Sequence, residues 1–232
     1  SKYKFHYSQT SIWNIKEAIN TLFEFTELSS RNNIKLILLK EISLSKDLLV
    51  KLKQKGYIDE NTFKKYNLIL SEQENKIHQL KENIFSKILE NEFILSIKNK
   101  VYFPAGDNFF DLPSYLNFLT FNKNKIYTSL DMMFDNYPVI NNTISAILEL
   151  KRRSSSFEEC VAVDGFYEIN YDKNQSLEII RIKMDKDMNV YPIVSLNNRK
   201  ISILFKMLSS QDLISKKISN DVSFSYSCIF KI

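Results

Sequence analysis

The first part of the chain carries apolar residues at helical spacing. A helix is predicted after an N-cap at Thr10 or Ser11, because the next residues place an apolar side chain every three or four positions. These positions are Ile12, Ile15, Ile19, Leu22 and Phe23. Trp13, beside this stripe, could stack on a base, but we expect it in the core. Residues 34–39 fit either a strand or a buried helical turn.

Helices are also predicted on both sides of a glycine. Ser45 is the expected N-cap of a helix over residues 46–55, Gly56 ends that helix, and Asp59 caps the next one. This next helix is expected to continue to about Glu90, because its apolar residues repeat every seven positions. The repeat comprises Phe63, Leu70, Ile77 and Ile84.

In the second part of the chain, shorter apolar runs predict strands separated by helices. Strands are expected at residues 93–103, 176–184, 190–196 and 222–230, the last of them at a sheet edge. Helices are expected at residues 157–169 and 201–214.

The residues of most interest for function lie in a predicted hairpin. Its strands would be residues 126–135 and 143–151, and residues 136–142 between them are rich in turn formers. Because side chains alternate between the two faces of a strand, Glu149 and Lys151 would share one face. An acid and a base at the end of an otherwise apolar strand are costly to bury, which favours a functional interpretation.

The register of this hairpin would bring a second carboxylate to the same place. A turn centred on Ile140 sets Asp131 opposite Glu149, whereas Asp135 would need a centre at the foot of the second strand. Facing carboxylates repel each other unless a divalent cation such as Mg²⁺ lies between them, and Lys151 could then position a water molecule. The alternative is an exposed sheet face that carries ordinary charges.

These residues resemble the motif of the PD-(D/E)XK nuclease superfamily, over roughly residues 120–185. The resemblance implies that Asp131 and Glu149 are metal ligands, and that Lys151 is the catalytic lysine that assists the attacking water. It also implies Mg²⁺, or Mn²⁺, as the cofactor. In this chain Leu130, rather than proline, precedes the aspartate. Whether Asp131 or Asp135 is the ligand stays open.

Basic residues on both sides of the motif are candidates for nucleic-acid contacts. Arg152 and Arg153 precede three serines, and charge and hydroxyl groups together suit phosphate. Lys123 and Lys125 lead into the strand that carries the aspartate. The alternative is that Ser156 caps a helix and the two arginines are merely solvated.

The composition excludes several kinds of chemistry. With three glycines among 232 residues, neither a GxGxxG motif nor a P-loop can exist. Two distant histidines argue against a histidine-rich zinc site, and two cysteines provide no disulfide framework. The net charge of +5 suits a polyanionic partner. We expect a cytoplasmic or otherwise intracellular protein without a membrane partner, since no apolar run is long enough to span a bilayer.

Taken together, the sequence predicts an α/β (α+β) chain. Residues 1–93 would be a helical region, and residues 94–232 a restriction-endonuclease-like core with a small mixed β-sheet flanked by helices. The predicted function is a metal-dependent nuclease that hydrolyses phosphodiester bonds. DNA is its expected partner, although RNA stays open, and a homodimer would suit double-strand cutting. The alternative is a non-catalytic domain that binds nucleic acid or protein.

Overall fold

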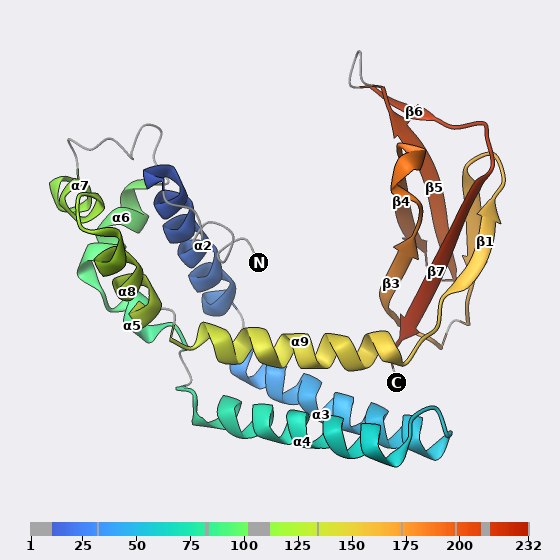
Figure 1. Cartoon of the computed structure of the whole chain (residues 1–232), viewed down its shortest axis with the longest axis horizontal. Coiled ribbons are helices and arrows are strands. Elements are labelled where there is room, and N and C mark those ends of the chain that lie inside the picture. The colour runs from blue at the N-terminus through green and yellow to red at the C-terminus, as the bar shows by residue number, and fades with distance from the viewer. Residues whose placement is uncertain are drawn as a thin grey trace. The chain divides into compact units, whose positions relative to one another are not determined.

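The chain is helical in its first part and forms β-strands in its last part, as a computed structural model shows (Figure 1). The structure describes residues 11–31, 33–81, 84–101, 112–133, 135–172, 174–197, 199–209 and 214–231. The chain forms two compact units. Unit 1 is Ser1–Leu49 with Glu60–Ile147, and unit 2 is Val50–Asp59 with Leu148–Ile232. The predicted α+β class, with its helical first half, is confirmed.

Helices make up unit 1, and two of them, α3 and α9, continue into unit 2. No helix in the described ranges is long and apolar enough to cross a membrane. The helices are α2 (Ile12–Arg31), α3 (Ile34–Gln54), α4 (Glu60–Gln79), α5 (Ser86–Leu89), α6 (Glu92–Val101), α7 (Pro113–Leu119), α8 (Lys123–Met133) and α9 (Tyr137–Arg153).

The predicted first helix is confirmed as α2, and its apolar stripe lies in the core. The Oγ of Ser11 accepts a hydrogen bond from the backbone N–H of Asn14 at 3.2 Å, as expected of an N-cap. Core side chains on this helix include Ile15, Ile19, Leu22 and Phe23. The prediction for Trp13 is wrong, because 72% of this residue is exposed.

The predicted hairpin at residues 126–151 is wrong, because both of its strands are helices, α8 and α9. Burial along α9 follows the helical period rather than alternation. Its buried residues are Tyr137, Ile140, Thr143, Ala146, Ile147, Leu150 and Lys151. Pro138 lies in the first turn, where a helix tolerates proline. The register that set Asp131 opposite Glu149 therefore does not exist.

Other helix boundaries also differ from the predictions. Ser45 lies inside α3 and is fully buried, so it caps no helix. The helix after Gly56 ends at Gln79, about ten residues earlier than expected. The strand predicted over residues 93–103 is wrong up to Val101, because these residues form α6; residues 102 and 103 lie outside the described ranges. The division expected at residue 93 falls within this same helix.

Two antiparallel sheets form most of unit 2 (Figure 1). Sheet A has the order β1-β7-β3, and sheet B has the order β2-β5-β4 with β6 also paired to β5. The sheets are therefore antiparallel rather than mixed, and a restriction-endonuclease-like arrangement is not confirmed. The strands are β1 (Glu158–Ala162), β2 (Phe166–Asn170), β3 (Leu177–Lys183), β4 (Val190–Asn197), β5 (Lys200–Leu208), β6 (Ser215–Lys217) and β7 (Val222–Phe230).

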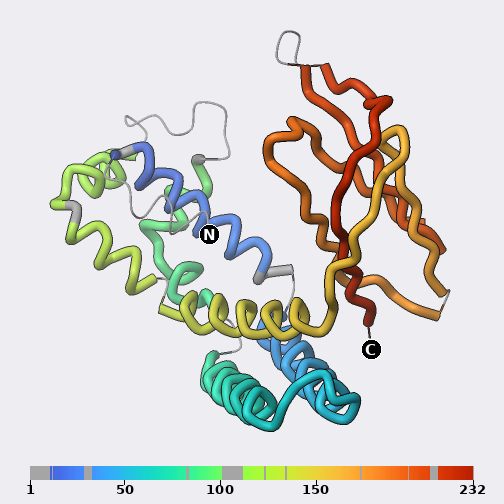
Figure 2. The backbone as a smooth tube through the Cα atoms, turned by 45° about the vertical axis from the view of Figure 1, so that its right-hand side comes forward, coloured from blue at the N-terminus to red at the C-terminus, as the bar shows by residue number. Residues whose placement is uncertain are grey.

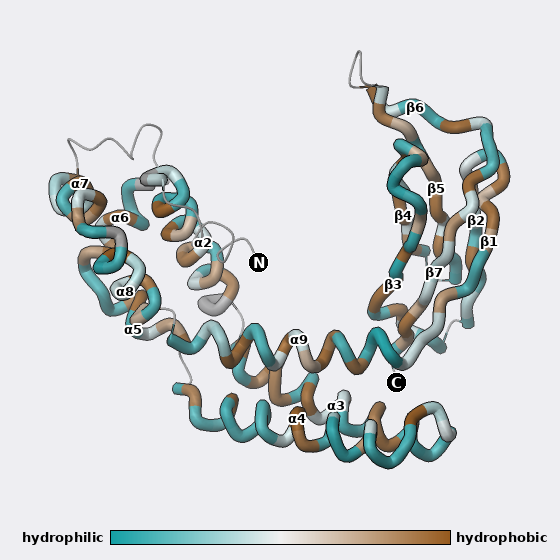
Figure 3. Tube along the Cα trace, viewed as in Figure 1, coloured by the Kyte–Doolittle hydropathy of each residue, from teal (hydrophilic) through white to brown (hydrophobic). Residues whose placement is uncertain are grey.

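The inner faces of the two sheets form one core, as the alternation of apolar and polar residues along the strands requires (Figure 3). Ile201, Ile203 and Phe205 point inward from β5, and Val222 and Phe224 point inward from β7. The rings of Phe205 and Phe224 meet edge to face, with their centroids 4.9 Å apart. This core fixes which side chains of each strand remain on the outside.

Two of the predicted strands, at residues 176–184 and 190–196, are confirmed as β3 and β4. The strand at 222–230 is also confirmed, but it is central in sheet A rather than an edge strand. The helices predicted at 157–169 and 201–214 are wrong. The first segment contains β1, a turn and most of β2, and the described residues of the second are strand β5, the loop residue Ser209 and Ile214.

A two-residue turn joins β1 to β2, and the chain reverses direction there (Figure 2). Asp164 and Gly165 both have positive φ angles, of 49° and 70°, as a type I′ turn requires. An Asp-Gly pair between apolar strands is a strong hairpin signal, and it outweighs the helical spacing seen in the sequence. A β-carbon at Gly165 would lie 3.3 Å from the Cγ1 of Ile218.

The two positive-φ glycines of unit 2 provide a matched test of this turn. Gly165→Ala should lower the free energy of unfolding by about 2 kcal/mol or more, because backbone strain adds to the contact with Ile218. Gly56→Ala has a similar φ of 72° but open space around it, so about 1 kcal/mol is expected. Urea denaturation measures both values, and equal losses would contradict the crowded turn.

Candidate functional site

The predicted catalytic residues are divided between the two units of the chain. Asp131 is an exposed residue of α8 in unit 1, whereas Glu149 and Lys151 belong to the part of α9 in unit 2. Two residues apart on a helix, these last two side chains point in different directions. Glu149 pairs with Arg153 one turn later, at 3.3 Å. Asp135, the other candidate ligand, pairs with Lys87.

Lys151 forms a largely buried ion pair. Its Nζ lies 2.9 Å from the Oε2 of Glu178 on β3, and the two side chains are only 11% and 21% exposed. A carboxylate beside a buried ammonium group offsets part of the cost of removing both charges from water. In this structure the predicted catalytic lysine attaches the last turn of α9 to sheet A.

The predicted nucleic-acid contacts lie on two different helices. Lys123 is the first residue of α8, and Lys125 is an exposed residue of the same helix. Arg152 and Arg153 are exposed in the last turn of α9. Basic residues are common in the last turn of a helix, where they complement the helix dipole.

A hydrogen-bond network holds the link between α9 and β1. Ser155 donates from its Oγ to the carbonyl of Cys228 at 2.9 Å, and that Oγ lies 2.7 Å from the Oγ of Ser227. The Nη2 of Arg181 donates to the carbonyl of Ser155 and to the Oγ of Ser227, both at 2.6 Å. The guanidinium also lies 4.6 Å from the ring centroid of Phe157. Ser155 thus serves the fold, and Ser156 precedes a strand rather than a helix.

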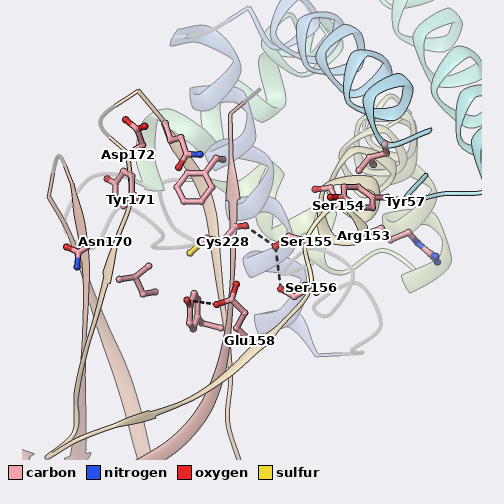
Figure 4. A pocket seen from close by; sticks show the side chains of 15 residues that line it. Tyr57, Arg153, Ser154, Ser155, Ser156, Glu158, Asn170, Tyr171, Asp172 and Cys228 are labelled. Carbon is pink, nitrogen blue, oxygen red and sulfur yellow. Dashed lines mark hydrogen bonds between the residues drawn. The ribbon is translucent and has the colours of Figure 1, made fainter. Parts of the chain in front are cut away.

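Beside this link lies a pocket of about 800 Å³ (Figure 4). All of its lining residues belong to unit 2. They come from the end of α3 and the turn after it, the last residue of α9 and the link that follows, strands β1, β2 and β7, and the loop between β2 and β3. Tyr226 donates from its hydroxyl to the Oε2 of Glu158 at 2.8 Å. Burial raises the pKa of Tyr226, and the nearby Glu158 raises it further. Burial and the same carboxylate raise the pKa of Cys228 to about 11.

A second feature of unit 2 is an apolar row on the outer face of sheet B. Phe166, Leu204 and Ile193 lie in direct register across β2, β5 and β4. Phe166 is 45% exposed and Ile193 is 40% exposed. In the next row, Lys206 of β5 lies between Tyr191 of β4 and Lys217 of β6.

Lys206 and Lys217 are in direct cross-strand register, which is unfavourable for like charges. Within the described part of the chain, neither Lys206 nor Lys217 has an ion-pair partner. By contrast, Lys200 on the same face pairs with Glu168 at 2.8 Å. The outer face therefore combines exposed apolar surface with two positive charges that lack a carboxylate.

This surface is not predicted from the sequence, because the apolar spacing at residues 157–169 and 201–214 predicts helices there. Two signals were present: the Asp164-Gly165 pair, and the alternation from Ile201 to Lys206, which is interrupted at Leu204. Read as strands, these segments put Leu204 and Lys206 on the face opposite to Ile203 and Phe205.

Comparison with known proteins points to cell division. The family model ZapD, described as a cell division protein, matches residues 1–204. The chain is 24% identical to "Cell division protein ZapD" of Coxiella burnetii over 212 residues, which are 91% of this chain and 82% of that protein. It is also 24% identical to the proteins of that name from Methylococcus capsulatus, covering 86% of this chain and 79% of the relative, and Aromatoleum aromaticum, covering 89% and 80%.

These matches overturn the nuclease interpretation. The resemblance to the PD-(D/E)XK superfamily rested on a short motif, whereas the family match covers most of the chain. The predictions of nucleic-acid hydrolysis and of a Mg²⁺ or Mn²⁺ cofactor are therefore wrong. In agreement, the described residues contain no group of three or more His, Cys, Asp or Glu that could hold a metal ion.

The role of Arg181 can be tested against an exposed arginine of the same unit. Arg181→Met should lower the free energy of unfolding by about 2 kcal/mol, because two hydrogen bonds to a charged group are lost. Arg152→Met should change it by less than about 0.5 kcal/mol, because that side chain is exposed. Thermal and urea denaturation give both values. A similar small change in both variants would show that the network contributes little.

The raised pKa of Cys228 predicts a pH dependence of stability. The folded chain holds the thiol proton more tightly than the unfolded chain, whose thiols titrate near 9.0. The contribution of Cys228 is therefore complete below about pH 9 and is lost as the pH rises to about 11. The stability difference between the wild type and Cys228→Ala, measured by urea denaturation, should shrink over this interval. A difference independent of pH would contradict the prediction.

Proposed function

Since the chain belongs to the ZapD family of cell division proteins, we propose that it acts in division as a non-catalytic protein-interaction component. The observation that carries the proposal is the exposed apolar row of Phe166, Leu204 and Ile193 beside two lysines. A contiguous apolar surface next to charged groups is typical of a protein interface.

The proposed partner is a protein segment that brings carboxylates to Lys206 and Lys217 and apolar side chains to the neighbouring row. Both lysines lack a carboxylate partner in the described structure, so an acidic segment would relieve the repulsion between them. The side chains around them supply apolar contact area, since Tyr191 is 36% exposed and Ile193 is 40% exposed. This mixture favours a protein over nucleic acid, which would be bound chiefly through many phosphate contacts.

The groups first considered catalytic agree with a non-catalytic role. Lys151 forms an ion pair with Glu178, and Glu149 forms one with Arg153 on the same helix. A catalytic lysine needs access to substrate and water, whereas this one is 11% exposed and paired.

Recruitment to the division site tests the proposal. In dividing bacterial cells, a fluorescently labelled copy should concentrate at the division plane. The double change Lys206→Glu with Lys217→Glu should weaken recruitment and capture of the partner by tenfold or more, because the charge of the face is reversed (about 1.4 kcal/mol for each factor of ten).

The matched control is Lys183→Glu, which reverses an exposed lysine in sheet A rather than sheet B. It should leave recruitment unchanged. If Lys183→Glu weakens recruitment as much as the double change at Lys206 and Lys217, the outer face of sheet B is not the interface. If the wild type itself shows no recruitment, the role in division is wrong for this chain.

A further inference from the structure

The pocket of unit 2 is lined by polar, aliphatic and aromatic side chains (Figure 4). Its volume of about 800 Å³ lies within the range of sites that hold ligands. Leu52 and Ile169 contribute aliphatic surface. The aromatic residues are Tyr57, Tyr171, Tyr226 and Phe230. Tyr57 is 71% exposed, although a tyrosine ring is usually at least partly covered in a folded chain.

Two carboxylates line the same pocket, and each is held in position by a hydrogen bond. The Oε2 of Glu158 accepts from the hydroxyl of Tyr226 at 2.8 Å. The Oδ1 of Asp172 accepts from the backbone N–H of Asn174 at 3.0 Å. On a chain with a net charge of +5, a concave site with two oriented carboxylates is a local reversal of charge.

Arg153 also lines this pocket, and its charge has to be considered. Its Nη2 lies 3.3 Å from the Oε1 of Glu149 on the preceding turn of α9, so a carboxylate already accompanies it. Figure 4 shows the guanidinium of Arg153 directed away from Glu158 and Asp172. The charge beside Glu158 and Asp172 is therefore negative.

We infer that this pocket binds the cationic side chain of an arginine or a lysine from a protein partner. The inference rests on the proposed protein-interaction role only for the source of the cation. Aromatic faces attract a cation, and oriented carboxylates form charge-assisted hydrogen bonds with it. The aliphatic stem of either side chain would pack on Leu52 and Ile169.

The remaining lining favours a peptide over a small free cation. Ser154, Ser156, Asn170 and Gln175 surround the pocket with groups that donate and accept hydrogen bonds, as the backbone on both sides of an inserted residue requires. The volume also exceeds that of one side chain, which leaves space for the neighbouring residues of the segment. This site is separate from the outer face of sheet B, since Glu158 and Tyr226 belong to sheet A and face its inner side.

Binding of short blocked peptides to the whole chain tests the inference. The probes are a tripeptide with a central arginine, one with a central lysine, and one with citrulline, which keeps the shape of arginine without its charge. Titration calorimetry should show binding of the arginine and lysine peptides and at least tenfold weaker binding of the citrulline peptide. Free arginine amide should bind more weakly than the arginine peptide, and equal affinity would overturn the peptide source.

Variants of the chain identify the site. Glu158→Gln and Asp172→Asn should each weaken the arginine peptide by about tenfold, and Tyr57→Leu, at an exposed position, by a few fold. Glu159→Gln is the matched control, because Glu159 is the next residue of β1 and lies on the opposite face. Circular dichroism confirms that each variant is folded.

Three results would overturn the inference. These are equal affinity for arginine and citrulline peptides, unchanged affinity in the variants of Glu158 and Asp172, and no binding of either cationic peptide at millimolar concentration. If the wild type binds the cationic peptides but is not recruited to the division plane in cells, the proposed function alone is contradicted.

Discussion

The ion pair between Lys151 and Glu178 is the interaction on which the rest of unit 2 depends. It joins the last turn of α9 to β3 at 2.9 Å, just before the chain enters the first strand. Burying two charges carries a large desolvation cost, which only a close partner and good geometry offset. The hydrogen bonds of Arg181 to Ser155 and Ser227 hold the link a few residues later. Together these contacts attach the last turn of α9 and the link after it to sheet A.

This arrangement separates the groups that maintain the fold from those available to a partner. The buried charges face the link and sheet A, whereas Lys206 and Lys217 lie on the outer face of sheet B. The inner residues of β5, from Ile201 to Phe205, are fully buried, and their alternation forces Leu204 and Lys206 outward. The pocket near Glu158 follows from the same geometry, because the link leaves space between the end of α9 and the strands.

The sequence predicted the α+β class, the first helix and three of the strands, because their periods were unambiguous over enough residues. The predictions are wrong where the apolar residues of a short segment fit both the strand period and the helical period. The residues from Ile144 to Leu150 alternate like a strand, yet Ile140, Ile147 and Leu150 also follow the helical period. Only packing decides between the two patterns.

The predicted catalytic motif is wrong for the same reason. Glu149 and Lys151 share a face only if they lie on a strand. Because they lie on helix α9, their side chains do not form the apparent motif. The partner of Lys151, Glu178, lies 27 positions further along the chain, and no local pattern connects the two. The exposed row on sheet B could have been found from the Asp164-Gly165 turn and the alternation in β5, but its register depends on pairing between distant strands.

A double-mutant cycle between Lys151 and Glu178 tests most directly that this lysine maintains the fold. The free energies of unfolding of the wild type, Lys151→Met, Glu178→Gln and the double variant give the coupling between the two side chains. A coupling of about 2 kcal/mol is predicted, since each single change leaves the other charge buried without its partner. Additive effects, with no coupling, would contradict the structural role of Lys151.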